Sequence, residues 1–196
     1  MEQYIIPSII LKKKFKDHSK FKKEVLTLIK NADDKDWTKK NDYFNDKLLK
    51  TDWPDADNPE RPWIKLIKDS LQEDLTKCAN YMGFQSIKLH KMWYQQYAYG
   101  DTHNWHTHDA NYTGTYYLEF DEKCPTTEFL YPDNLLKSFT IDVEEGDILF
   151  FPCHLIHRSS VSKSNNIKSI ISWNVDFGLI NKEFLNDREK IEVLKK

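Results

Sequence analysis

The chain has 196 residues, of which 39% are hydrophobic and 14% aromatic, and its formal net charge is -2. This length suggests a single domain with one sizeable core, and the charge gives no electrostatic support for a nucleic-acid partner. No apolar run is long enough to cross a membrane, and Pro7 breaks the short one near the N-terminus, so neither a membrane span nor a signal peptide is expected. The three cysteines are far apart and form no CxxC pair, which favours reduced thiols in a cytoplasmic protein.

The chain begins with a strand and a helix. A strand is expected within residues 4–15, and Pro7 places it at the edge or the start of a sheet. The lysine cluster in residues 12–16 is interpreted as a solvated rim rather than a polyanion site, because acidic residues interrupt it. Apolar residues at helical spacing then predict a helix over residues 17–29.

A long polar loop is expected over residues 31–60, with a short helix at 43–49. A loop of this length in a compact domain is often a lid or a substrate-binding flap. A surface excursion pinned by Trp37 and Trp53 fits the pattern equally well.

The strongest helical pattern lies between residues 58 and 82, where apolar residues form one face. Asn58 is expected to cap its first turn, with Pro59 at the first helical position. Gly83 is a suitable stop, because glycine adopts the left-handed conformation common after a helix end.

The periodicity changes to two from residue 86 onward, which indicates strands. The expected strands cover residues 87–99, 105–108, 112–120, 127–131, 138–143, 147–151, 155–161 and 167–177. About eight short strands separated by turn signals predict an α+β, mainly β fold, with a double-sheet jelly roll as the natural candidate. We therefore expect one domain over residues 1–196: N-terminal strand, helices and loop at 1–84, a β-core at 85–180, and a charged tail at 181–196.

Three histidines stand where a metal site on a β-scaffold would need them. His106 and His108 are two residues apart, so on a strand they share a face, and His157 follows a later apolar run. Neutral imidazoles suit Fe, Zn, Cu or Ni, and three protein ligands leave positions open for a substrate, as in catalytic sites. His103 has the opposite parity and is interpreted as lying at the rim or behind the ligands, and His154 as structural.

A longer series of residues between Tyr94 and Phe177 surrounds these histidines. In chain order it comprises Tyr97, Gly100, His106, Thr113, Tyr117-Leu118, Gly146-Asp147, Phe150-Phe151, His157, Lys168 and Asn174. In order and spacing, this series resembles the Fe(II)- and 2-oxoglutarate-dependent oxygenases, in particular the prolyl-4-hydroxylase-like branch and its phage-type relatives.

The resemblance implies a double-stranded β-helix, the cupin-like form of the jelly roll, with the N-terminal helices packed on one sheet. It implies a hydroxylase that uses Fe(II), 2-oxoglutarate and O2, with ascorbate as a candidate reductant, and that releases succinate and CO2. The implied metal ligands and catalytic residues are His106, His108 and His157, and the implied co-substrate residues are Tyr97, Thr113 and Lys168. Lys168 would pair with the far carboxylate of 2-oxoglutarate, with Tyr97 and Thr113 as hydroxyl donors; the alternative is an exposed strand lysine.

One position departs from the family pattern of His-x-Asp/Glu. The chain has His106-Thr107-His108, and Asp109 follows one residue too late. We expect His108 to take the place of the acid, because side chains alternate along a strand and position 109 points away. The alternative is a local bulge that brings Asp109 to the metal while His108 lies behind it.

Two other functions fit the same residues: a cupin-type three-histidine dioxygenase that needs no 2-oxoglutarate, and a non-catalytic jelly-roll module. The substrate, a small molecule or a peptide, is not identified by the sequence. No nucleic-acid or membrane partner is expected, and a phage-encoded protein of the host cytoplasm would suit the resemblance. Four aromatic residues could line the site or belong to the core: Trp93, Trp105, Tyr99 and Tyr112.

Overall fold

The computed structural model describes residues 8–32 and 46–180. Its elements are, in chain order, β1 (Leu11–Lys14), α1 (His18–Asn31), β2 (Lys50–Thr51), the 3-10 turn η1 (Trp53–Asp55), α2 (Pro62–Tyr81), β3 (Ile87–Tyr97), β4 (His103–His106), β5 (Tyr112–Glu119), β6 (Thr127–Tyr131), β7 (Asn134–Thr140), β8 (Asp147–Pro152), β9 (His157–Ser159) and β10 (Lys168–Phe177). Among these described elements, neither helix has the length and apolar character that a membrane span requires.

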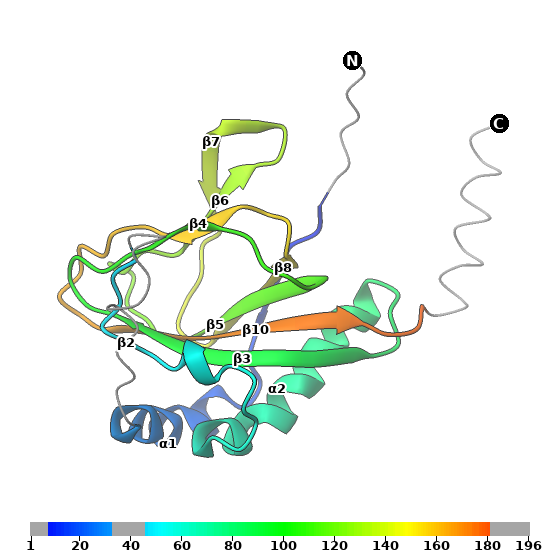
Figure 1. The fold of residues 1–196 in the computed structure, drawn as a ribbon, viewed down its shortest axis with the longest axis horizontal. Helices are drawn as coiled ribbons and strands as arrows, with labels where there is room; N and C mark the ends of the chain where they lie inside the picture. The colour runs from blue at the N-terminus through cyan, green and yellow to red at the C-terminus, as the bar shows by residue number, and fades with distance from the viewer. Residues whose placement is uncertain (1–7, 33–45, 181–196) are drawn as a thin grey trace.

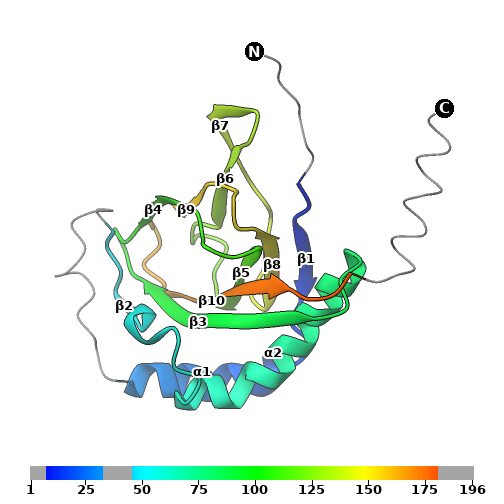
Figure 2. The same cartoon turned by 45° about the vertical axis from the view of Figure 1, so that its right-hand side comes forward.

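The strands form two antiparallel sheets (Figure 1). The larger has the order β1-β8-β5-β10-β3-β2, and the smaller has the order β4-β9-β6-β7. From β3 to β10 the chain passes repeatedly between the sheets, with only the β6–β7 hairpin staying within one of them. β4 and β9 of the small sheet thus lie above β3, β5 and β10 of the large one (Figure 2). This is a double-stranded β-helix, and the expected fold class is confirmed.

Both helices cover the outer face of the large sheet, as Figure 2 shows. The core between helices and sheet is built from side chains that alternate along the strands, such as Tyr94 on β3 and Ile171 and Trp173 on β10. They meet the apolar face of α2, where Ile67 and Leu71 are fully buried. Large apolar side chains buried in this way each contribute about 1.5–3 kcal/mol, so this layer fixes the sheet in place.

The opposite face of the large sheet points toward the small sheet and is much more polar. It presents Trp93, Gln95 and Tyr97 from β3 and Lys168 and Ser172 from β10. A buried polar side chain is costly unless it has a partner, so a polar interior in a small barrel marks the place of a site.

Gly114 on β5 is required by the packing of the large sheet. A Cβ atom at this position would lie 2.3 Å from the backbone oxygen of Leu149 and 2.5 Å from the indole of Trp173. The carbonyl belongs to the paired strand β8 and cannot move aside. Any side chain here would therefore displace Trp173 from the core.

Two expectations for the first half of the chain were wrong in their bounds. The first strand spans only Leu11–Lys14, and residues 4–7 of the expected range lie outside the described chain. Residues 43–45 of the expected short helix also lie outside it, and Lys47 forms a β-bridge with Thr102 instead of a helical turn. Residues 33–45 of the expected lid and the tail at 181–196 are likewise not described.

The start of α2 was predicted too early. The helix begins at Pro62, and the Asn58 side chain accepts a hydrogen bond from the backbone N–H of Glu60 in a turn before the helix. Arg61 explains the delay, because its buried guanidinium donates to Asp52 and to the backbone oxygen of Met92. Tertiary contacts of the arginine thus hold residue 61 in an extended conformation. At the other end of the helix, Gly83 follows the last turn with a φ of 90°, as expected.

The eight strands from residue 86 onward agree in number and order with expectation, with two shifts that matter, whereas β2 was not expected. β4 covers His103–His106, so His108 lies beyond the strand rather than within it. β7 begins at Asn134, because the turn of the β6–β7 hairpin is formed by Pro132 and Asp133 alone. This hairpin projects from the barrel (Figure 1).

Candidate metal and co-substrate site

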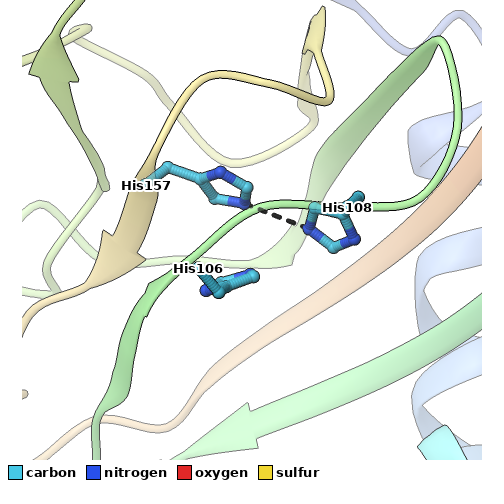
Figure 3. A group of neighbouring side chains, drawn as sticks. All are labelled: His106, His108 and His157. Carbon is cyan, nitrogen blue, oxygen red and sulfur yellow. Dashed lines mark hydrogen bonds between the residues drawn. The ribbon is translucent and has the colours of Figure 1, made fainter.

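The three expected histidines meet at one end of the barrel. His106 is the last residue of β4, and it pairs with His157, the first residue of β9. His108 lies in the following segment, where its backbone N–H donates to the carbonyl of Cys153 at 3.1 Å. One nitrogen atom from each imidazole lies within 4.8 Å of the others, and Figure 3 shows the rings turned toward one another.

Backbone contacts set the orientation of two of these rings. Nδ1 of His106 lies 2.6 Å from the carbonyl oxygen of Asn104, and Nδ1 of His157 lies 2.8 Å from that of Leu155. A carbonyl only accepts, so both Nδ1 atoms carry the proton and both Nε2 atoms keep a lone pair. Nε2 of His157 faces Nε2 of His108 at 3.2 Å (Figure 3), so the free lone pairs converge.

The surroundings keep the imidazoles neutral. Burial lowers the pKa of His157 to about 4 and that of His108 to about 2, and it lowers the pKa of His106 well below the usual value. Repulsion among the neighbouring imidazoles adds to the effect for all three, and a protonated ring could not bind a metal. The cluster is therefore ready to accept a cation at neutral pH without losing protons.

His108 reaches the cluster by a different route from the one expected. Because it lies beyond β4, strand alternation does not position it; its ring stacks instead on Trp93 of β3, with centroids 5.7 Å apart and planes 29° apart. Asp109 is exposed and does not belong to the described cluster. Trp93 and the Cys153 hydrogen bond thus direct His108, and not Asp109, toward the other two rings.

Lys168 lies in the same cavity as the three imidazoles. Its side chain is fully buried, and Nζ donates to the carbonyl of Pro125 at 2.9 Å and to the hydroxyl of Ser159 at 2.5 Å. No described carboxylate pairs with it, and burial lowers its pKa to about 7. A buried ammonium without an anion is costly, which is the property expected of an anion-binding residue.

The other two residues expected at this end occupy different positions. Tyr97 lies under the ammonium, with Nζ of Lys168 4.1 Å from its ring centroid, and it shares a hydrogen bond with Ser159. Burial raises the pKa of the Tyr97 phenol far above its usual value, so it remains a donor. Thr113 lines the cavity, but its hydroxyl donates to the backbone oxygen of Trp173 at 2.6 Å, so its hydrogen is already engaged.

Ser159 is a site residue that the sequence analysis missed. It bridges Lys168 and Tyr97, and it lies two residues after His157 on the same face of β9. The alternation of strand side chains was the available signal. Tyr117 and Thr127, whose hydroxyls lie 2.8 Å apart, complete the polar lining here.

The remaining candidates divide between the site and the scaffold. His103 donates from Nδ1 to Asp46 at 2.6 Å, and its ring lies 4.1 Å from that of His106, behind the cluster. Trp93 lines the cavity that holds the three imidazoles and Lys168. The Trp105 ring lies beneath the guanidinium of Arg158, with 4.3 Å between the guanidinium carbon and the ring centroid. The other two aromatic residues do not line either cavity at the histidines: Tyr99 is exposed and Tyr112 packs against Phe150. His154 is exposed and contacts Ser8.

No protein-family model matches the sequence, and no curated protein matches it closely. Solved structures do. The viral collagen prolyl hydroxylase of Paramecium Bursaria Chlorella virus-1, in complex with 2-oxoglutarate, superposes with a TM-score of 0.56 at 17% identity, covering 85% of this chain and 94% of that one.

HygX from Streptomyces hygroscopicus, with nickel and 2-oxoglutarate bound, gives a TM-score of 0.60 at 10% identity over 85% of this chain and 82% of that one. A prolyl hydroxylase from Trichoplax adhaerens, in complex with a hypoxia inducible factor peptide, gives 0.54 at 18% identity over 89% and 84%. At these identities the similarity establishes the fold.

Proposed function

We propose that this chain, which has the fold of Fe(II)- and 2-oxoglutarate-dependent oxygenases, is itself an oxygenase of this type that hydroxylates an organic substrate. One observation carries the proposal: a single cavity holds three convergent neutral imidazoles and a buried lysine that has no anionic partner among the described residues. 2-Oxoglutarate has complementary ends, a keto acid that chelates a metal and a distant carboxylate that needs a cation.

The donor set suits the metal. Neutral imidazole nitrogens bind Fe(II) well, and three ligands from the protein leave positions open for a bidentate co-substrate and O2. Three neutral rings leave the ion at a formal charge of about +2, which the 2-oxoglutarate dianion brings near zero. Lys168 then balances the charge at the far end of the cavity.

His106, His108 and His157 are the proposed ligands, with His108 in the position where the family pattern has an acid. A structure with metal bound tests this directly. A His108 nitrogen about 2.0–2.2 Å from the ion supports the assignment. An Asp109 carboxylate oxygen at that distance, with His108 turned away, contradicts it.

The residues of the chain have three tasks in this mechanism. The imidazoles hold the metal through Nε2, with His106 and His157 kept in that tautomer by backbone carbonyls. Lys168 and Tyr97 fix the far carboxylate, and the indole of Trp93 excludes water on the substrate side. When bound, iron, 2-oxoglutarate and O2 supply the oxidising power that inserts one oxygen atom into an aliphatic C–H bond, with the other oxygen atom retained in succinate and CO2 released.

Succinate release from 2-oxoglutarate in the presence of Fe(II), O2 and ascorbate tests the proposal. We expect slow turnover even without substrate, lost in His157→Ala and retained in His154→Ala, a matched control because His154 is exposed and lies outside the cluster. Metal-loaded protein that neither binds nor consumes 2-oxoglutarate would overturn the proposal and favour a cupin-type three-histidine dioxygenase. Protein that binds no metal would favour a non-catalytic module.

A further inference from the structure

A second cavity lies beside the three imidazoles and does not include Lys168. Its volume is about 260 Å³, and its described walls include Asp46, Trp53, Trp93, Gln95, His103 and His108. Under the proposed function this is where the substrate would lie, because the open side of His106 and His108 faces it.

The formal charge on the described walls of this cavity is negative. No lysine or arginine lines the described part of the cavity, and Asp46 is the one residue there with a formal charge. Its side chain is only 2% exposed, and its oxygens accept from Nδ1 of His103 at 2.6 Å and from the backbone N–H of Asn104 at 2.8 Å. An anionic substrate group would therefore be placed near a buried carboxylate, with no lysine or arginine among the described wall residues to balance it.

Two polar side chains in the walls have atoms with no partner among the described residues. Nδ1 of His103 donates to the Asp46 carboxylate, and Nε2 of the same ring makes no hydrogen bond within the described chain. Gln95 is 6% exposed, lines the cavity, and makes no side-chain hydrogen bond within the described chain. A purely apolar occupant would leave both groups desolvated and unpaired, at a cost for each.

The apolar part of the wall consists of two indoles. Trp53 and Trp93 are edge-to-face, with centroids 4.5 Å apart and planes at 82°. The negative face of an indole attracts cations and packs well on methylene groups. Lys91, whose Nζ lies 5.6 Å from the centroid of Trp53, already makes such a contact without lining the cavity.

We infer that this cavity binds a protonated primary amine at the end of an aliphatic chain, of the kind that a lysine side chain carries. The ammonium donates to the Gln95 carbonyl oxygen, and the buried carboxylate of Asp46, which lies behind the His103 ring, stabilises the positive charge. The methylene groups contact Trp53 and Trp93 and lie near the metal-binding cluster. The inference rests on the proposed function for the reaction, but amine binding itself needs neither metal nor 2-oxoglutarate.

The test compares three probes on the full chain without metal and without 2-oxoglutarate. They are the Nα-acetyl N-methylamides of lysine, of 6-hydroxynorleucine, which replaces the ammonium with a hydroxyl, and of glutamate. Binding is followed by indole fluorescence and by NMR titration. We expect the lysine probe to bind about tenfold more tightly than the hydroxyl probe, with the glutamate probe weakest.

Variants assign the preference to the walls. Asp46→Asn should remove most of the preference for the ammonium, and Asp57→Asn, at an exposed position on the loop that follows η1, should retain it. Gln95→Leu keeps the side-chain size and provides a second variant if Asp46→Asn fails to fold. Equal affinity for the lysine and hydroxyl probes, or no binding of any probe at millimolar concentration, would overturn the inference. So would a preference that survives both wall variants, and the succinate assay would stand independently of all these results.

Discussion

Replacement of Lys168 by methionine should weaken 2-oxoglutarate binding strongly while stabilising the ligand-free protein. Methionine has a similar length and no charge, so it fits the buried position. Burial lowers the pKa of Lys168 from 10.5 to about 7, so the folded protein disfavours the ammonium by an amount on the order of 5 kcal/mol when no anion is bound. Because the pKa is lower in the folded state than in the unfolded state, this penalty is complete below pH 7 and disappears as the pH rises toward 10.5.

Loss of one partner from a desolvated charge pair costs about 2–4 kcal/mol, which corresponds to a dissociation constant about 30-fold to about 1000-fold weaker. Isothermal titration of 2-oxoglutarate into Ni(II)-loaded protein measures it, and titrations in two buffers near pH 8 should also reveal proton uptake on binding. Lys65→Met removes an exposed lysine from α2 and should change nothing. A Lys168→Met dissociation constant within about threefold of the unmodified chain would refute the reasoning. Lys168→Arg need not restore binding, because the guanidinium is larger and planar.

Three further predictions concern the imidazoles. Elemental analysis should show that His106→Ala and His157→Ala lose the metal and that His154→Ala retains it; full retention in folded His157→Ala would end the metal assignment. Asp109→Asn should keep the metal content of the unmodified chain, whereas His108→Ala should lower it, and the reverse pattern would make Asp109 the ligand. Because burial lowers the pKa of His157 to about 4, the unfolded state takes up the proton first as the pH falls, so the metal-free protein should lose stability between pH 6.5 and pH 4. Thermal unfolding across that range tests this, and a melting temperature that does not fall would contradict the buried, neutral imidazole.

The architecture of the β-core could be predicted from the sequence because each strand carries its own period-two signal. β8 and β10, which both belong to the large sheet, were identified from local residues. The start of α2 could not be predicted in the same way. The sequence offers two starts with a proline at the first helical position, Asn58-Pro59 and Arg61-Pro62. The choice depends on contacts of the folded chain, because Arg61 binds Asp52 and the backbone oxygen of Met92 on β3.

The same distinction applies to the site. His106 and His157 follow from spacing, and Lys168 follows from its place at the start of an apolar strand. Asp46 and Gln95 do not, because they become site residues only through contacts made by the folded chain: Asp46 reaches His103 across the barrel mouth, and Gln95 faces inward from the middle of β3. The sequence can suggest the chemistry of the ligands, whereas the lining of the second cavity is formed by the packing of separate segments.

The two ends of the large sheet protect the protein from unwanted association. A sheet edge presents unpaired N–H and C=O groups to which a strand of another molecule could add. Here one edge, β2, has two residues, and the other, β1, has four, three of them lysines. Lys13 and Lys14 are held in place by Asp74 and Asp147 of the same chain. An incoming strand would have to displace or bury these charges, so the basic cluster that could have suggested a polyanion site opposes the addition of a strand at this edge of the sheet.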